Sequence, residues 1–236
     1  MSRAAYLRNR IQRILLVCCV IQVGAFAAFA QHQGNKYIFH NDLEREKLKG
    51  RIKSVTVTES EAESGQVKLK TITEYNEAGN IIGFTSYSAD GALLSRTTYT
   101  YNDSGLLKEE RKLKADGTLN VRTTCLINER GYKTEEDNYD AGGVLFLKVL
   151  NKYDGKGNRI VKDSYNEFGS LFLKCNSKFD EEGNEIVGKE FDSHEKLKFT
   201  TTYEYSDPDN QGNWLRRITL KNDVPFLISV RGIVYR

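Results

Sequence analysis

The chain has 236 residues, with 35 lysines and arginines against 32 acidic residues, only two prolines and four cysteines. Its first 30 residues hold four of the basic residues and none of the acidic ones, which leaves 31 basic against 32 acidic residues in the remainder. That balance excludes the basic footprint of a nucleic-acid-binding protein.

Residues 1–30 have the layout of a secretory signal peptide. Four arginines open the segment, an apolar run spans 14–23, and Ala28-Phe29-Ala30 supplies a small-x-small cleavage site. A membrane anchor is the alternative, but the apolar run is short. A lipid anchor at Cys18 is a minor alternative, because Val17 stands where lipoprotein signals carry a small residue. We expect export to the periplasm, cell surface or extracellular space, with no membrane span after cleavage.

Residues 31–50 form a leader of different composition. Asn41 to Glu44 is typical of a helix start, with Glu44 at the capping-box position, and Gly50 is expected to end a short charged helix. Leu43 and Leu48 can pack this helix against one end of the following sheet. We expect the helix to cover an exposed edge strand.

Residues 51–236 are expected to be a single domain built from a tandem repeat of 26 residues. Two series of glycines, one beginning at Gly79 and one at Gly65, recur at that spacing, and internal repeats are the first feature to look for in a sequence. The glycines that we expect in structural turns are Gly79, Gly91, Gly105, Gly117, Gly131, Gly143, Gly157, Gly169 and Gly183.

The turn chemistry of the repeat predicts β-hairpins. An Asn or Asp stands three residues before each glycine of the first series, as in Asp154 and Gly157. An Asx side chain that bonds to the backbone, followed by a left-handed glycine, is typical of a type I turn in a hairpin. The spacing leaves roughly 8–10 residues for each strand.

The repeat therefore predicts an all-β fold, a long antiparallel meander with a short N-terminal helix. A flat sheet of about a dozen strands would expose its apolar face, and large twisted sheets curl or split. We expect the sheet to curl into an open, barrel-like coil with the Leu, Tyr and Phe face inside. An elongated single-layer sheet is the alternative.

Cys125 and Cys175 remain once the signal peptide is removed. Export would favour a disulfide. The two cysteines lie two repeats apart, however, which is four strands or roughly 19 Å in a meander, beyond the reach of a disulfide. We expect buried free thiols.

The last repeat is irregular. A three-residue insertion near Asp209 breaks the period, and Pro225 suits an edge strand. We expect Trp214 to plug the end of the sheet rather than to bind a ligand.

The motifs Tyr153-Asp154-x-x-Gly157-Asn158 and Phe179-Asp180-x-x-Gly183-Asn184 resemble the YD repeats of the RHS family. With the signal peptide and the Gly-Asn-Trp ending at 212–214, residues 48–236 are similar to small secreted YD-repeat proteins of Bacteroidetes-type bacteria. The resemblance implies a β-sheet shell, since RHS proteins enclose toxin domains in such shells, and it implies no catalytic residues.

The sequence predicts neither an enzyme nor a cofactor. His32, His40 and His194 share no repeat column with a carboxylate or thiol, and no metal or phosphate-loop motif occurs. The segment 207–212 resembles half of a calcium loop, but Ile218 replaces the bidentate glutamate.

We therefore expect a non-enzymatic exported module that binds another envelope protein through its sheet faces or edges. The alternative is glycan binding by exposed aromatic rings, and a hydrolase is the least favoured hypothesis. The candidate binding aromatics are Tyr75, Tyr101, Tyr153, Tyr205 and Trp214.

Overall fold

The computed structural model describes residues 38–236, so the predicted signal peptide at 1–30 and the start of the leader lie outside the described residues. The described chain folds into the short helix α2 (Asp42–Arg45) and fourteen strands. The strands are β1 (Ile52–Glu61), β2 (Val67–Tyr75), β3 (Ile81–Ser88), β4 (Leu93–Tyr101), β5 (Leu107–Lys114), β6 (Leu119–Ile127), β7 (Lys133–Asp140), β8 (Leu145–Tyr153), β9 (Arg159–Asn166), β10 (Leu171–Phe179), β11 (Glu185–Phe191), β12 (Leu197–Pro208), β13 (Trp214–Lys221) and β14 (Val224–Tyr235).

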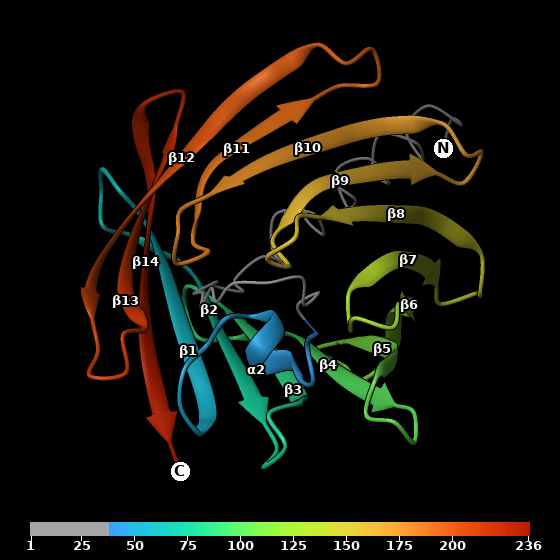
Figure 1. The fold of residues 1–236 in the computed structure, drawn as a ribbon, viewed down its shortest axis with the longest axis horizontal. Helices are drawn as coiled ribbons and strands as arrows, with labels where there is room; N and C mark the ends of the chain where they lie inside the picture. The colour runs from blue at the N-terminus through green and yellow to red at the C-terminus, as the bar shows by residue number, and fades with distance from the viewer. Residues whose placement is uncertain (1–37) are drawn as a thin grey trace.

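The strands form one closed barrel in which each strand pairs antiparallel with its neighbours in the sequence (Figure 1). Closure comes from β1 and β14, where Ile52 lies opposite Tyr235 and Val57 opposite Arg231. The predicted all-β meander of hairpins is confirmed. The expected open coil closes completely, which leaves no edge strand unpaired among residues 38–236.

A β-bulge beside all but one of the turns explains why the repeat rolls up. In the β4–β5 hairpin, Thr100 lies opposite Glu109 while Tyr101 lies opposite Leu107, so Lys108 is an extra residue on its strand. Every hairpin except β12–β13 has such a register shift. Bulges bend a strand and increase its twist, so one bulge per hairpin curves the whole meander in one sense.

The turns have the geometry that their residues predict. The nine predicted turn glycines all have φ between 74° and 84°. In the β8–β9 turn, Asp154 Oδ1 accepts hydrogen bonds from the backbone N–H groups of Lys156 (2.9 Å) and Asn158 (2.8 Å). The Asx residue thus satisfies two donors of the turn, and glycine takes the left-handed position that follows.

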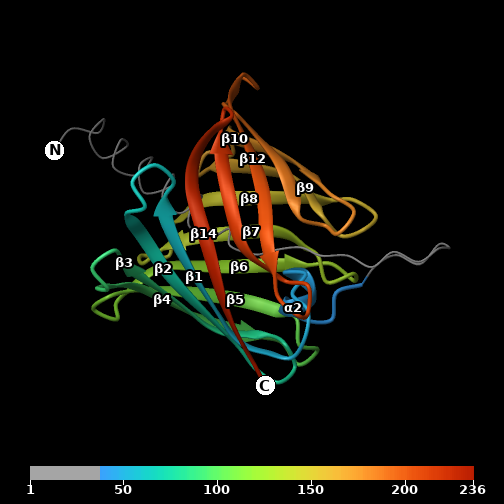
Figure 2. The ribbon, with the colours of Figure 1, turned by 90° about the vertical axis from the view of Figure 1, so that its left-hand side faces the viewer.

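The two ends of the barrel differ. Residues 38–50, which we call the plug, cross the end formed by the β2–β3, β6–β7, β8–β9 and β12–β13 turns. We call this the plugged end. At the opposite end, a β-carbon added at Gly91, Gly117, Gly143 or Gly169 would meet nothing within 4 Å. This end is formed by every second turn of the meander, from the β1–β2 turn to the β13–β14 turn. We call it the open rim (Figure 2).

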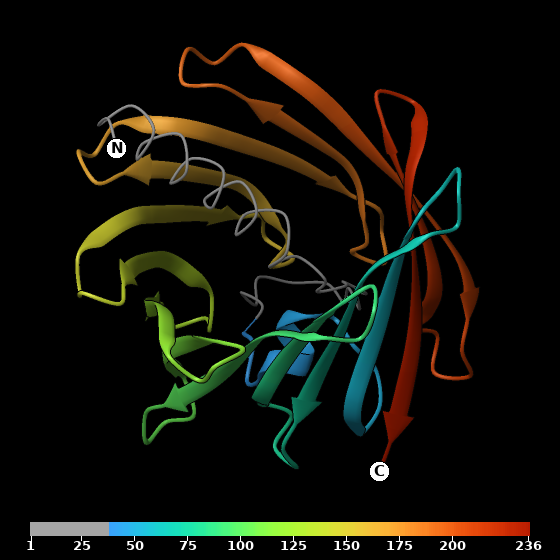
Figure 3. The same cartoon turned by 180° about the vertical axis from the view of Figure 1, so that it is seen from behind.

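The plug corrects the prediction that the leader covers an edge strand. The backbone N–H of Phe39 donates to the carbonyl of Arg130 (2.9 Å), and that of Leu43 donates to Gly79 (3.0 Å). Further along, the Lys49 N–H donates to Asn213 Oδ1 (2.8 Å). Helix α2 therefore lies within the ring of strands (Figure 3), because closure of the barrel removes the edge that it was expected to cover.

The helix itself is shorter than expected. Asn41 caps α2, since its Oδ1 accepts a hydrogen bond from the Glu44 N–H (2.9 Å). The Glu44 carboxylate in turn accepts from the N–H of His40 rather than from that of Asn41. The predicted helix start is therefore in the right place, but only four residues are helical.

The interior is a mixture of apolar and polar side chains. One buried apolar cluster packs the plug against the first strands through Leu48, Ile52, Val55, Val57, Tyr75 and Ile81, and a second includes Val121, Leu147 and Val149. Between them lie buried polar groups: Thr123 Oγ1 donates to Asn138 Oδ1 (2.7 Å), and Asn138 Nδ2 donates to the Leu147 carbonyl (3.3 Å). The inner face is therefore less apolar than the sequence pattern predicts.

Candidate functional site: the barrel interior and the open rim

Three of the predicted binding aromatics fasten neighbouring strands together. The hydroxyl groups of Tyr101, Tyr153 and Tyr205 each donate a hydrogen bond to a backbone carbonyl 20 residues earlier. The acceptors are Ile81 (2.7 Å), Lys133 (3.0 Å) and Glu185 (2.8 Å), each the first residue of the preceding strand. The tyrosine column of the repeat is thus part of the barrel wall.

The other two candidate aromatics are more deeply buried. Tyr75 is 1% exposed, and its hydroxyl donates to the carboxylate of Glu46 in the plug. Trp214 is 6% exposed, and its ring centroid lies 5.3 Å from that of Tyr205. The exposed row of tyrosines on which the glycan-binding alternative depends is therefore not found in the described barrel.

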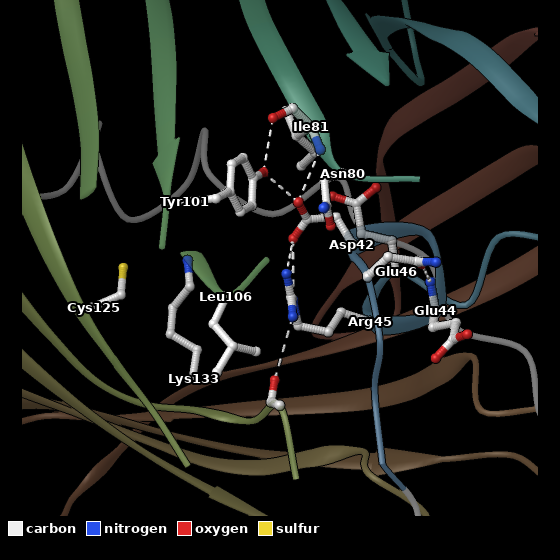
Figure 4. A network of polar contacts seen from close by, with 12 residues as sticks. Asp42, Glu44, Arg45, Glu46, Asn80, Ile81, Tyr101, Leu106, Cys125 and Lys133 are labelled. Atoms are coloured by element: carbon white, nitrogen blue, oxygen red, sulfur yellow. Dashed lines mark hydrogen bonds and ion pairs between the residues drawn. The ribbon is translucent and has the colours of Figure 1, made fainter. Parts of the chain in front are cut away.

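Buried carboxylates hold the plug in place (Figure 4). The Asp42 carboxylate accepts hydrogen bonds from the Ile81 N–H (2.8 Å), from the Tyr101 hydroxyl and from Arg45. Arg45 also donates to the carbonyl of Gly131 (3.5 Å). Burial raises the pKa of the neighbouring Glu46 carboxyl to about 7. Buried polar groups need hydrogen-bond partners, and here the groups of the plug and those of the barrel supply them to each other. These bonds fix the plug in place.

A second charged cluster lies on the inner face of β5, β6 and β7. Lys133 Nζ is 2.7 Å from Glu110 Oε1 and 3.5 Å from Glu136 Oε2. Burial opposes ionisation of Glu136, but Lys133 and other nearby cations outweigh it and lower the Glu136 pKa to about 2. Because both carboxylates neutralise one lysine, the cluster has the character of a structural ion pair.

Cys125 lies beside this cluster, with its Sγ 3.9 Å from Glu110 Oε1. Burial raises the pKa of its thiol to about 12, so the thiolate is a minor species at neutral pH. Within residues 38–236, Cys125 and Cys175 are not joined by a disulfide, as the repeat spacing predicts.

A pair of arginines surrounds Trp214 on the inner face of β13 and β14. Cζ of Arg231 lies 3.4 Å from the centroid of the indole ring, and Cζ of Arg217 lies 5.4 Å from it. Arg217 Nη2 is 3.3 Å from Ser229 Oγ and 3.8 Å from Glu59 Oε1. Burial, followed by repulsion from Arg217, lowers the pKa of Arg231 to about 9. These arginines were not predicted as site residues from the sequence, since they fall in the irregular last repeat.

The described residues contain no group of three or more His, Cys, Asp or Glu side chains arranged to hold a metal ion. In the segment 207–212, Asp209 Oδ1 accepts hydrogen bonds from the backbone N–H groups of Gln211 (2.9 Å) and Asn213 (2.8 Å). Asp209 therefore has the same turn-forming role as the Asx residues of the regular repeats. In residues 38–236, no helix is long and apolar enough to cross a membrane.

Most of the exposed apolar side chains at the open rim lie on one half of its circumference, whereas Leu94, near the start of β4, lies on the other half. Four consecutive hairpin turns, from β7–β8 to β13–β14, present exposed apolar residues, which are Val144, Phe168, Leu197, Val224 and Phe226. We call this set the apolar rim. Phe168, at 80% exposure, is the most exposed of them. Phe168 was not predicted as a binding residue from the sequence. The equivalent positions of two earlier turns are Asp90 and Asp116, so the phenylalanine is an exception in this column of the repeat.

No protein-family model matches the chain, and no curated protein matches it. The resemblance to YD repeats therefore stays an expectation. Several solved structures resemble the chain at low sequence identity. A porin-like protein from Bacteroides uniformis has 14% identity, a TM-score of 0.49, and coverage of 78% of this chain and 96% of its own.

Two further structures are more distant. A Vibrio parahaemolyticus domain named for outer membrane lipoprotein sorting has 10% identity, a TM-score of 0.33, and coverage of 77% of this chain and 84% of its own. A Tc holotoxin pore from Photorhabdus luminescens has 13% identity, a TM-score of 0.24, and coverage of 70% of this chain and 9% of its own.

Proposed function

We propose that this chain is a non-enzymatic, exported envelope protein that binds another protein through its apolar rim. The observation that carries the proposal is Phe168, a phenylalanine with 80% of its surface exposed at the tip of a turn. Exposed aromatic residues beside other apolar groups mark interaction surfaces, and aromatic side chains contribute strongly to binding.

The turn does not need the Phe168 side chain. Asn166 Oδ1 accepts hydrogen bonds from the N–H groups of Phe168 and Ser170, both at 3.0 Å, and Gly169 takes the left-handed position. At the equivalent position of an earlier turn, Asp116 accepts a hydrogen bond from the Thr118 N–H (2.9 Å). A phenylalanine ring cannot replace that bond, so its presence favours a role outside the fold.

Because the barrel is closed, we place the binding surface at the rim and not at a strand edge. Addition of a partner strand requires a free edge, and β1 is paired with β14. The outer wall carries ion pairs, such as Lys148 Nζ with Glu135 Oε1 (2.5 Å) and with Asp137 Oδ1 (3.1 Å). Exposed apolar side chains such as Leu126 and Val230 are interspersed on the same wall, which is therefore mixed and not a continuous apolar band. The predicted signal peptide supports export.

Site-specific photo-crosslinking in native envelopes tests the proposal. A photoreactive residue at position 168 or 224 is expected to capture the same protein, and an excess of unlabelled barrel should compete with this capture. Position 82 is the matched control, because Ile82 is 54% exposed at the plugged end.

Substitution gives a second arm of the same test. Phe168→Asp is expected to weaken capture by at least about tenfold, the effect of removing one aromatic anchor. Ile82→Asp should leave capture unchanged. Equal capture from positions 82 and 168, or recovery of polysaccharide alone, contradicts a protein-binding rim.

A further inference from the structure

The inner face of β13 and β14 gathers several polar donors that lack partners. Arg231 is 4% exposed and its Nε is buried without a hydrogen bond, as are Arg217 Nε and Trp214 Nε1. Arg231 lies over the Trp214 ring and is attracted by the Glu46 carboxylate, but within residues 38–236 it forms no ion pair at 4 Å or less. A buried guanidinium without an acceptor is costly and needs an explanation.

The nearby carboxylates are already engaged by other groups. Glu46 accepts from Tyr75, and Glu185 Oε1 accepts from Ser177 Oγ (2.5 Å). Glu59 accepts from Ser229 Oγ (3.3 Å) and lies 3.8 Å from Arg217, which is a long ion pair. Burial raises the pKa of both carboxyls, and that of Glu46 reaches about 7, so the negative charge of Glu46 is reduced near neutral pH. The two guanidinium groups are thus only partly neutralised.

We propose that Arg217 and Arg231 form a binding site inside the barrel for a small oxyanion, a carboxylate or a phosphate. Guanidinium groups match the geometry of such anions through paired N–H donors. Two arginines that repel each other in the free protein gain most from an anion placed between them. The Trp214 ring fixes the Arg231 plane, which leaves the edge of that guanidinium to donate.

The site can be reached from the open rim. The Arg217 side chain keeps 12% of its surface exposed, so it borders accessible space within the barrel. Lys221 lies on the same strand and face as Arg217, four residues nearer to the open rim, and it is exposed. Two acidic residues lie at the same part of the rim: the exposed Asp223 in the β13–β14 turn, and Glu61 at the end of β1, which is engaged by Lys68 (2.6 Å). Lys221 therefore adds a positive charge between the rim and the arginine pair, which would favour the entry of anions.

Trp214 is the sole tryptophan in the chain, so its fluorescence reports directly on this site. The full exported chain is titrated with sodium phosphate and, separately, with sodium succinate, up to roughly 10 mM, a range that includes weak binding. Ionic strength is held constant with sodium chloride. We expect a saturable change with at least one oxyanion and none with chloride alone. Saturation by phosphate only, or by succinate only, identifies the class of ligand.

Variants assign the effect to the arginine pair. Arg231→Gln and Arg217→Gln are each expected to weaken binding by at least about tenfold. Arg216→Gln is the matched control, because Arg216 is the neighbouring residue of β13 with its side chain on the outer face. If Arg231→Gln does not fold, Arg231→Lys keeps the charge and loses the paired donors, and it should bind more weakly than wild type.

Three results overturn the proposal. The first is a wild-type fluorescence signal that does not saturate with either oxyanion. The second is a response to chloride equal to the response to phosphate and succinate. The third is equal binding by the Arg216, Arg217 and Arg231 variants.

Discussion

The ring of Phe39 lies against the α-carbon of Gly157, so closely that an added β-carbon would stand 2.6 Å from Phe39 Cζ. This contact joins the plug to the β8–β9 turn. Gly143, on the open rim, has the same left-handed backbone but no neighbour within 4 Å of such a β-carbon. Substitutions at these two glycines therefore distinguish the cost of backbone strain from the cost of a close contact with the plug.

We predict that Gly143→Ala lowers the free energy of unfolding by about 1–2 kcal/mol, the cost of a β-carbon at positive φ. Gly157→Ala should cost more, by roughly another 1–3 kcal/mol for the overpacked contact. Denaturant unfolding of both variants measures the difference. In a Phe39→Ala background the two glycine variants should become equally costly. Equal costs in the wild-type background would show that the plug does not press on this turn.

The Asp42 carboxylate offers a second test of the plug. Asp42→Ala removes the acceptor for the Ile81 N–H and leaves Arg45 without its carboxylate, while the Tyr101 hydroxyl keeps the Ile81 carbonyl as its acceptor. We expect a loss of about 2–4 kcal/mol in unfolding free energy, because buried donors lose their partners. Glu77→Ala, at an exposed position in the β2–β3 turn, is the control and should change stability little. A loss of the same small size in both variants would contradict the anchoring role.

Glu46 makes stability depend on pH. Burial raises its pKa from 4.5 to about 7 in the folded state, so between these pH values the folded protein binds more protons than the unfolded chain. Stability contributed by this group therefore falls as pH rises from about 4.5 to 7, by roughly 1–3 kcal/mol. Glu46→Gln should flatten that part of the profile and keep an acceptor for Tyr75.

The pH profile is measured as the unfolding free energy of wild type, Glu46→Gln and the exposed control Glu77→Gln. Only the Glu46 variant should change the slope. Glu136, with its pKa lowered to about 2, acts in the other direction and only at more acidic pH, where protonation removes its stabilising charge. A wild-type profile that rises through neutral pH would be the opposite of the expected sign.

The Cys125 thiol should be unreactive in the folded protein. Its pKa of about 12 leaves little thiolate at pH 8, and its side chain faces the barrel interior. We expect mass spectrometry to find Cys125 unmodified after brief treatment of the native protein with iodoacetamide, and modified after unfolding. Phe168→Cys, which places a thiol on the open rim, is the positive control and should react at once. Rapid modification of native Cys125 would show that it is more accessible than the structure indicates.

The local structure of this protein could be predicted because it repeats. Asp154 and Gly157 form their turn with hydrogen bonds between residues at most four apart, so each hairpin turn can be predicted from a few neighbouring residues. Asn41 marks the start of α2 for the same reason. These features depend on residues close together in the chain.

Closure and the plug depend on residues far apart. The pairing of Ile52 with Tyr235 joins the first strand to an irregular last repeat, and no local pattern encodes it. The leader was expected to cover an edge strand because an open sheet has such strands, whereas the closed barrel has none among residues 38–236. Arg231 and Phe168 escaped notice because each departs from its repeat column or lies outside the regular repeats.

The pairing of β1 with β14, which closes the barrel, also determines how long the folding protein is prone to aggregate. Until β14 emerges and pairs with β1, both strands present unsatisfied backbone groups at the edges of an otherwise complete sheet. The partners are separated by nearly the whole domain, so this last contact forms slowly relative to the hairpins. A chain that loses its final strand would therefore keep almost all of its local structure and still be prone to aggregate.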